Sequence, residues 1–302
     1  MKHKKALSLL LAATMTLGLM GGICSAPVLA ADSGYRERPP EEEQLFRAPD
    51  WTETPVTVQS GPNTLTGVIT KPKDASGKVP MAILLHGLGT TQFWCMDISW
   101  YLAGEGIASI RFDFAGNGMS TGAQEDMTVG SEVANTVDVL DYVKGLPYVD
   151  TDNIFLVGKS MGGVDALMAN RQRSGDVKAL VLWYPALGIA DAVRHGFLLG
   201  EFFDPQDLPE TLTAVGYTYG RGFLEELMGL DMTGICRSCS QPVLILHGDQ
   251  DNVAPIPFSY AMRDEFSDCK LTVVPGGGHG FWGFQELKAL EDMTSFIKEH
   301  IE

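Results

Sequence analysis

The chain has 302 residues, of which 45% are hydrophobic and 20% are charged, and this composition suits one large globular domain with a substantial core. Its formal net charge of −16 argues against nucleic acid or an anionic membrane surface as a partner, because an acidic surface repels polyanions. The sequence offers no cluster of lysine and arginine that would offset this repulsion.

The first 30 residues have the three parts of a secretory signal peptide. A basic start, MKHKK, precedes the apolar run ALSLLLAATMTLGLM, and the small residues of APVLAAD follow. The run is shorter than the roughly 20 residues that a membrane-spanning helix needs. We therefore predict cleavage between Ala30 and Ala31, a secreted protein without a membrane anchor, and a polar leader over residues 31–54.

From residue 55 to residue 302 the pattern predicts a mostly parallel, doubly wound α/β sheet. TPVTVQS and TLTGVITKP flank the turn GPN and indicate an antiparallel hairpin at one edge. Six apolar runs follow, without the alternation of half-exposed strands, as is typical of strands buried on both faces. They are VPMAILLHG, ASIRFDF, NIFLVG, KALVLWYP, PVLILHG and KLTVVPG, with helices expected near 92–104, 128–145, 160–174, 257–267 and 283–300.

A long connection precedes the penultimate strand. About fifty residues, 187–240, separate the two apolar runs, where a strand-helix-strand unit needs far fewer. The sequence therefore predicts an inserted cap. Its aromatic side chains are either candidate substrate-binding residues or the small core of the insertion itself. The candidates are Phe197, Phe202, Tyr217, Tyr219 and Phe223.

Two segments match the G-x-S-x-G pattern, which places a nucleophilic serine on a sharp strand-to-helix turn. Ser160 follows the strand NIFLV directly and leads into the helical stretch VDALMANRQ. Ser120 lies six residues beyond its strand, among glycines and polar residues typical of a loop. The sequence thus favours Ser160 as the nucleophile.

A serine hydroxyl needs a histidine base, which in turn needs a carboxylate to fix its tautomer. His279 lies in the glycine-rich segment VVPGGGHGF, directly after the last strand, and is the candidate base. Asp249 and Asp251 both follow the penultimate strand in LILHGDQDNVAP, and either could supply the carboxylate.

The reaction also needs two amide donors for the oxyanion. The residue after the nucleophile, Met161, supplies one, and Leu88 in the loop HGLG is the candidate for the other. We expect no metal and no organic cofactor. Cys236 and Cys239 have metal-ligand spacing, but no second pair follows, so they form a local disulfide or stay as two thiols.

Over residues 55–302 the chain resembles the α/β-hydrolase superfamily, and more narrowly the bacterial cinnamoyl and feruloyl esterases. The similarity is carried by LLHGLG, RFDFAGNGMSTG, MTVGSEVANTVDVLDYVKGLPYV, NIFLVGKSMGG and PVLILHGDQDNVAP. The resemblance implies a triad of Ser160, Asp251 and His279 and oxyanion amides at Leu88 and Met161. It also implies a cap that shapes an aromatic acyl pocket.

The chain departs from this family at several positions. Lys159 stands before the nucleophile, where the family usually has histidine, and Met161 follows it in place of a frequent glutamine. The family's RFDFNGHG loop reads RFDFAGNG, and Phe223 lies near the position expected for a phenol-binding tyrosine. These changes are compatible with the same mechanism but with weaker selectivity for hydroxycinnamates.

The sequence thus predicts an exported serine hydrolase of small-molecule carboxylic esters with aromatic or short-to-medium acyl groups. One alternative is a serine peptidase of the same fold. The other is a hydrolase-like binding protein without activity.

Overall fold

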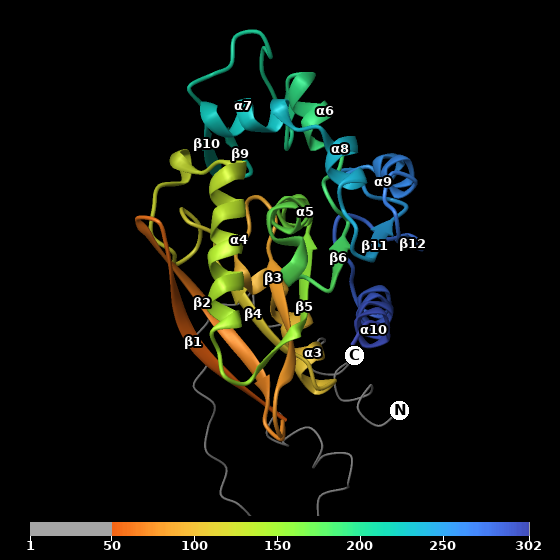
Figure 1. Ribbon diagram of the computed structural model, residues 1–302. Coiled ribbons are helices and arrows are strands. Elements are labelled where there is room, and N and C mark those ends of the chain that lie inside the picture. The colour runs from red at the N-terminus through yellow and green to blue at the C-terminus, as the bar shows by residue number, and fades with distance from the viewer. Residues whose placement is uncertain (1–49, 302) are drawn as a thin grey trace, which may run out of the picture. The chain divides into compact units, whose positions relative to one another are not determined.

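The computed structural model describes residues 50–301, so the predicted signal peptide and residues 31–49 of the leader lie outside the described residues. An eight-stranded sheet runs through this part in the order β1-β2-β4-β3-β5-β6-β11-β12 (Figure 1). β1 pairs with β2, and β2 with β4, in antiparallel fashion, and every other neighbouring pair is parallel. This confirms the predicted fold class. The strands are β1 Trp51–Ser60, β2 Asn63–Pro72, β3 Val79–Leu85, β4 Ala108–Phe112, β5 Val149–Lys159, β6 Ala179–Trp183, β11 Val243–Gly248 and β12 Cys269–Val274.

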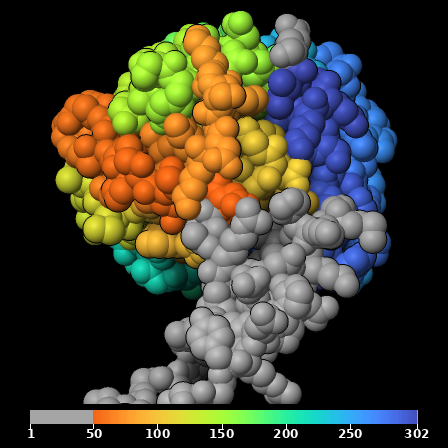
Figure 2. Space-filling view, turned by 90° about the horizontal axis from the view of Figure 1, so that it is seen from below, coloured from red at the N-terminus to blue at the C-terminus, as the bar shows by residue number. Residues whose placement is uncertain are grey.

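Helices cover both faces of the sheet. α4 and α5 pack together against β3 and β5, whereas α3 and α10 contact each other beside β4 and β11. Seen from below in Figure 2, yellow residues of α3 lie between the orange β1–β2 hairpin and the dark blue α10. The helices that connect the strands are α3 Met96–Gly104, α4 Val129–Lys144, α5 Met161–Arg173, α9 Pro257–Arg263 and α10 Phe284–Glu299.

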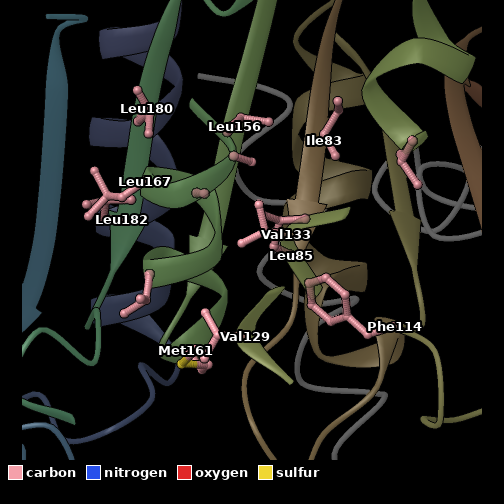
Figure 3. Packing of buried hydrophobic residues seen from close by; sticks show 14 of the residues in the cluster. Ile83, Leu85, Phe114, Val129, Val133, Leu156, Met161, Leu167, Leu180 and Leu182 are labelled. Carbon is pink, nitrogen blue, oxygen red and sulfur yellow. The ribbon is translucent and has the colours of Figure 1, made fainter. Parts of the chain in front are cut away.

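The central strands are buried on both faces, which explains why their sequences do not alternate. Every residue of β4 and β6 is buried, as are the last five residues of β3. Helix side chains complete this core, and Figure 3 shows Val133 of α4 and Leu167 of α5 in the cluster with Leu85, Leu156 and Leu182 of the strands.

Helix α4 begins at a capping box. The Thr128 side chain accepts a hydrogen bond from the Ser131 N–H, and the Ser131 hydroxyl oxygen accepts one from the Thr128 N–H. These two bonds satisfy backbone donors that the first turn leaves unpaired, so the helix starts at a defined residue, Val129.

Between β6 and β11 the chain makes a series of short elements, shown in green and teal at the top of Figure 1, at the end of the sheet where β6 leads into α6. We call residues 187–240 the cap. Two small antiparallel hairpins, β7–β8 and β9–β10, form part of it. Its elements are α6 Ile189–Arg194, β7 Phe197–Leu198, β8 Glu201–Phe202, β9 Thr211–Ala214, β10 Tyr217–Gly220, α7 Arg221–Gly229 and α8 Met232–Arg237.

None of the helices within residues 50–301 is both long enough and apolar enough to cross a bilayer.

Candidate active site

Ser160 occupies a strained turn between β5 and α5. Its backbone has φ 56° and ψ −118°, a region that non-glycine residues rarely adopt and that is found mainly at functional sites. The Ser160 N–H donates to the Trp183 carbonyl oxygen over 2.9 Å, which ties the turn to β6. A Cβ atom on Gly162 would lie 2.4 Å from the Leu85 carbonyl oxygen, so the helix can approach β3 only because this residue is glycine.

The structure brings Ser160, His279 and Asp251 into one hydrogen-bonded chain. His279 Nε2 lies 2.9 Å from Ser160 Oγ, and His279 Nδ1 lies 2.8 Å from Asp251 Oδ2. The three residues follow β5, β12 and β11, whose carboxyl ends share one edge of the sheet. This edge is where open α/β sheets hold their ligands.

Asp251 is buried and held by several donors. Its Oδ1 accepts hydrogen bonds of 2.9 Å from the Val253 and Ala254 amides. Burial by itself opposes ionisation, but hydrogen bonds from His247 and His279 outweigh it and lower the pKa of Asp251 below its usual value. Asp251 is therefore an anion at neutral pH. A carboxylate at this place keeps the proton of a neutral imidazole on Nδ1 and leaves Nε2 free to accept one from Ser160.

His247 is a supporting residue that the sequence analysis did not single out. Its Nε2 lies 2.7 Å from the Ala254 carbonyl oxygen and 3.3 Å from Asp251 Oδ2, and its Nδ1 lies 2.8 Å from Ser259 Oγ. The side chain is fully buried, so its orientation is fixed by these partners. No local pattern marked this contact, because a spacing of four residues brings side chains together on a helix, whereas His247 lies in β11 and Asp251 in the loop after it.

The other candidate acid, Asp249, and the other candidate nucleophile, Ser120, have local structural partners instead. Asp249 Oδ1 accepts a 2.7 Å hydrogen bond from the Gly276 N–H and braces the turn that precedes His279. Ser120 Oγ donates to the Asp113 carbonyl oxygen over 2.6 Å and accepts from the Thr66 N–H over 2.9 Å. Neither side chain is hydrogen-bonded to His279.

The predicted oxyanion donors flank the serine. Met161 is the first residue of α5, and Leu88 lies in the loop after β3. Neither amide has a hydrogen-bond partner within residues 50–301, so both are available to a ligand. The Leu88 loop reaches the nucleophile, because a Cβ atom on Gly87 would lie 2.9 Å from Ser160 Cβ. Two free amides beside a serine hydroxyl can stabilise a negative oxygen bonded to the carbon that the serine attacks.

The five aromatic candidates of the cap fall into three places. Tyr217 lies beside the loop of residues 86–89, which carries Leu88 and which we call the oxyanion loop. Its ring atoms would be 3.5 and 3.7 Å from a Cβ atom on Gly89. Tyr219 and Phe223 are fully buried and stack on each other at 5.3 Å. Phe197 and Phe202 pair across the β7–β8 hairpin at 5.1 Å, with Phe202 82% exposed.

Trp94 is a further aromatic residue at the site, and the sequence analysis missed it. It belongs to a short 3-10 helix, η1 (Gln92–Cys95), between β3 and α3. Its ring centroid lies 6.3 Å from that of His279 and 5.8 Å from that of Tyr184. The sequence held no signal for this contact, because the two rings are brought together only by the pairing of distant elements.

The cysteines do not form a disulfide or a metal site in the described part of the chain. Cys95, Cys236, Cys239 and Cys269 are free thiols, and residues 50–301 contain no cluster of three or more metal-ligating His, Cys, Asp or Glu side chains. Burial raises the pKa of the Cys236 thiol to about 12, so it stays protonated and unreactive.

Comparison with a solved structure decides the family. Est1E from Butyrivibrio proteoclasticus, solved with ferulic acid bound, is 30% identical, with 81% of this chain and 98% of that chain aligned and a TM-score of 0.77. The chain belongs to the α/β-hydrolase superfamily. Within the superfamily, residues 79–205 match the family described as serine aminopeptidase, S33.

Curated relatives in this α/β-hydrolase superfamily act on ester or thioester bonds by name. The monoacylglycerol lipase of Mycolicibacterium smegmatis is 24% identical over 249 residues, which are 73% of this chain and 89% of the relative. The mitochondrial palmitoyl-protein thioesterase ABHD10 of Homo sapiens is 25% identical over 221 residues, or 67% of each chain. This α/β-hydrolase therefore falls among the esterases, lipases and thioesterases, with carboxylic-ester hydrolysis as the supported reaction class.

Proposed function

We propose that this protein is an exported serine carboxylic-ester hydrolase that works through an acyl-enzyme. The observation that carries the proposal is the continuous hydrogen-bonded chain from Ser160 Oγ through the His279 ring to Asp251 Oδ2. A hydroxyl with a histidine acceptor, itself oriented by a carboxylate, is the arrangement that activates serine for attack on an acyl carbon.

In the proposed first half-reaction, Ser160 Oγ bonds to the ester carbonyl carbon while its proton passes to His279 Nε2. The carbonyl oxygen becomes negative and is held by the Leu88 and Met161 amides. The bond to the alcohol oxygen then breaks, and His279 gives its proton to the departing alkoxide. Water repeats the sequence on the acyl-serine, releases the acid and restores Ser160.

For the acyl group we propose an aromatic or short-to-medium chain. The support is the position of Tyr217 beside the oxyanion loop, where the acyl carbon must be held. A flat acid buries apolar area against an aromatic face with little loss of rotamer freedom. The likeness to Est1E, whose structure contains ferulic acid, points the same way.

Tyr217 gives this acyl assignment a matched test. Tyr217→Ala should lower kcat/KM for methyl cinnamate and methyl ferulate more than for p-nitrophenyl acetate, by about tenfold, the loss expected from one ring contact. Thr213→Ala, on the exposed side of the same hairpin, should leave the ranking unchanged. Equal losses on all three esters would remove Tyr217 from the acyl pocket.

Selectivity between cinnamate and ferulate is proposed to be weak. Phe223, near the position expected for a phenol-binding tyrosine, is buried and has no hydroxyl. A pocket that does not hydrogen-bond a hydroxyl discriminates on its presence by about 100-fold at most. A ratio of kcat/KM values beyond that, in either direction, would mean that another polar side chain reads the phenol.

A serine peptidase of the same fold is the second candidate, and the family described as serine aminopeptidase favours it. Assays on p-nitrophenyl butyrate, methyl ferulate, p-nitrophenyl palmitate and aminoacyl-p-nitroanilides separate the candidates. We expect turnover of the first two and little of the last two. Anilides as the best substrates would establish the peptidase, and inactivity on every substrate would favour a binding protein.

Export is part of the proposal and rests on the N-terminal pattern of residues 1–30. Secreted protein should begin at Ala31. Intact-mass analysis measures this directly, and a mass that retains the first 30 residues would contradict cleavage.

A further inference from the structure

The Trp94 ring lies against both reacting side chains of the candidate site. Its Cζ3 atom and Ser160 Cβ would each be 2.9 Å from a Cβ atom on Gly87, so ring and nucleophile pack around the same backbone position. The ring also contacts the His279 imidazole, with centroids 6.3 Å apart. Trp94 is only partly buried, so part of the residue remains accessible to solvent.

Buried Lys159 holds Trp94 in place. Its Nζ donates a 2.5 Å hydrogen bond to the Trp94 carbonyl oxygen and lies 5.6 Å from the centroid of the Trp94 ring. The same ammonium forms a 3.3 Å ion pair with Asp97, and Asp97 also interacts electrostatically with Glu286 of α10. Because the lysine side chain is only 5% exposed, its charge serves this internal network and not a ligand.

The cap contacts a different part of the oxyanion loop. Tyr217 and Val215 of the cap lie beside Gly89, two residues beyond the glycine that Trp94 contacts. The ester site is thus bordered by cap residues next to the Leu88 amide and by Trp94 next to His279. An ester has two substituents on its reacting carbon, an acyl chain and an alkoxy group, and each needs its own binding surface.

The chemistry assigns the alkoxy group to the Trp94 side. His279 protonates the departing alkoxide, so the alcohol oxygen must come within hydrogen-bond distance of Nε2, and the rest of the alcohol extends past the imidazole. Of the Trp94 and Tyr184 rings, which both lie against this imidazole, Tyr184 is buried and Trp94 keeps part of its surface exposed. We propose that Trp94 is the binding surface for the alcohol group of the substrate and that it favours flat, uncharged, aromatic alcohols; this inference rests on the proposed esterase function.

Two exposed aromatic residues lie close to Trp94 and His279 in the chain. Phe93 precedes Trp94 and is 62% exposed, and Trp282 follows His279 by three residues and is 65% exposed. The Trp282 indole lies against the backbone next to His279, 3.8 Å from where a Cβ atom on Gly280 would be.

The test compares two esters with the same acyl group and alcohols of similar acidity, methyl butyrate and benzyl butyrate. Wild-type protein should give a kcat/KM about tenfold higher for the benzyl ester, as one added ring contact predicts. Trp94→Ala should lower this benzyl-to-methyl ratio by about tenfold, and Trp94→Phe should retain most of it. Because both esters form the same butyryl-enzyme, the ratio cancels any effect of the variant on the shared acyl group.

Further variants keep the test decisive if Trp94→Ala does not fold. Phe93→Ala and Trp282→Ala alter exposed side chains and should each lower the ratio by about threefold. Tyr217→Ala, on the cap side, should leave the ratio unchanged while it changes the acyl ranking. If methyl butyrate is still hydrolysed and none of the Trp94, Phe93 and Trp282 variants changes the benzyl-to-methyl ratio, the inference is overturned. If the wild-type protein hydrolyses no ester at all, the proposed esterase function is rejected instead.

Discussion

Asp251 Oδ2 is shared by two histidines, His279 at 2.8 Å and His247 at 3.3 Å. His279 is partly exposed and faces Ser160. His247 is fully buried, and its Nε2 also contacts the Ala254 carbonyl oxygen at 2.7 Å, while Ser259 contacts its other nitrogen. One histidine is thus placed to move protons, and the other to fix the carboxylate. Since the same oxygen of Asp251 faces both rings, a substitution of His247 should disturb the orientation of His279 indirectly, through Asp251.

The assignment of the nucleophile is tested by Ser160→Ala. This substitution should lower kcat for ester hydrolysis by a factor on the order of 10⁴ to 10⁶, because no other hydroxyl in the described site is hydrogen-bonded to His279. Ser120→Ala is the control. It should retain most activity and lose about 1 kcal/mol of stability through its two backbone hydrogen bonds. An inactive Ser120→Ala beside an active Ser160→Ala would reverse the assignment.

The assignment of the carboxylate is tested by Asp251→Asn. This substitution should lower kcat by roughly 10⁴, because the amide favours the wrong tautomer of His279. Asp249→Asn should have a mild effect, since Asp249 braces only the Gly276 backbone. Steady-state kinetics on p-nitrophenyl butyrate measures both. If the Asp249 variant proved the more damaged, the turn at Gly276 would matter more than the carboxylate beside the histidine.

Buried acids and pH. Glu132 of α4 and Asp165 of α5 are buried acids that interact electrostatically, and both oxygens of Asp165 lack a hydrogen-bond partner among the described residues. Burial raises the pKa of Glu132 above its usual value. The folded state therefore holds a proton that the unfolded chain releases, and stability falls as pH rises above about 4.3, the value of an unfolded glutamate.

Glu132→Gln removes this titrating group. We expect it to raise the midpoint of thermal unfolding at pH 8 and to change it little at pH 4, where the wild-type carboxyl is mostly protonated in both states. Thermal melts of both proteins at the two pH values give the comparison. A larger gain at pH 4 would show that Glu132 is ionised in the folded protein.

The ion pair of Lys159 and Asp97 is expected to contribute to stability. Lys159→Met should destabilise the protein by about 3–5 kcal/mol, because it leaves the mostly buried Asp97 without its cation. The double variant Lys159→Met/Asp97→Leu removes both charges and should recover most of that loss. Denaturant unfolding measures the three proteins. A double variant no more stable than Lys159→Met would mean that the hydrogen bond to the Trp94 carbonyl, and not the ion pair, provides the stability.

The sequence by itself determined the sheet and the serine turn, because both depend on local patterns. Doubly buried strands need unbroken apolar runs, and the turn at Ser160 needs the glycine at position 162 to let α5 approach β3. His279 could be chosen as candidate base for the same reason, since it directly follows a strand whose carboxyl end is at the edge where Ser160 lies.

Tertiary structure alone decided which side chains face one another. Asp249 and Asp251 are two residues apart, and only the path of the loop after β11 directs one to Gly276 and the other to His279. Tyr217 and Tyr219 of the cap were equivalent in sequence, yet one borders the oxyanion loop and the other is buried against Phe223. The contact of Trp94 with His279 joins segments 185 residues apart, and such a contact has no local pattern because it arises only when the distant strands pair.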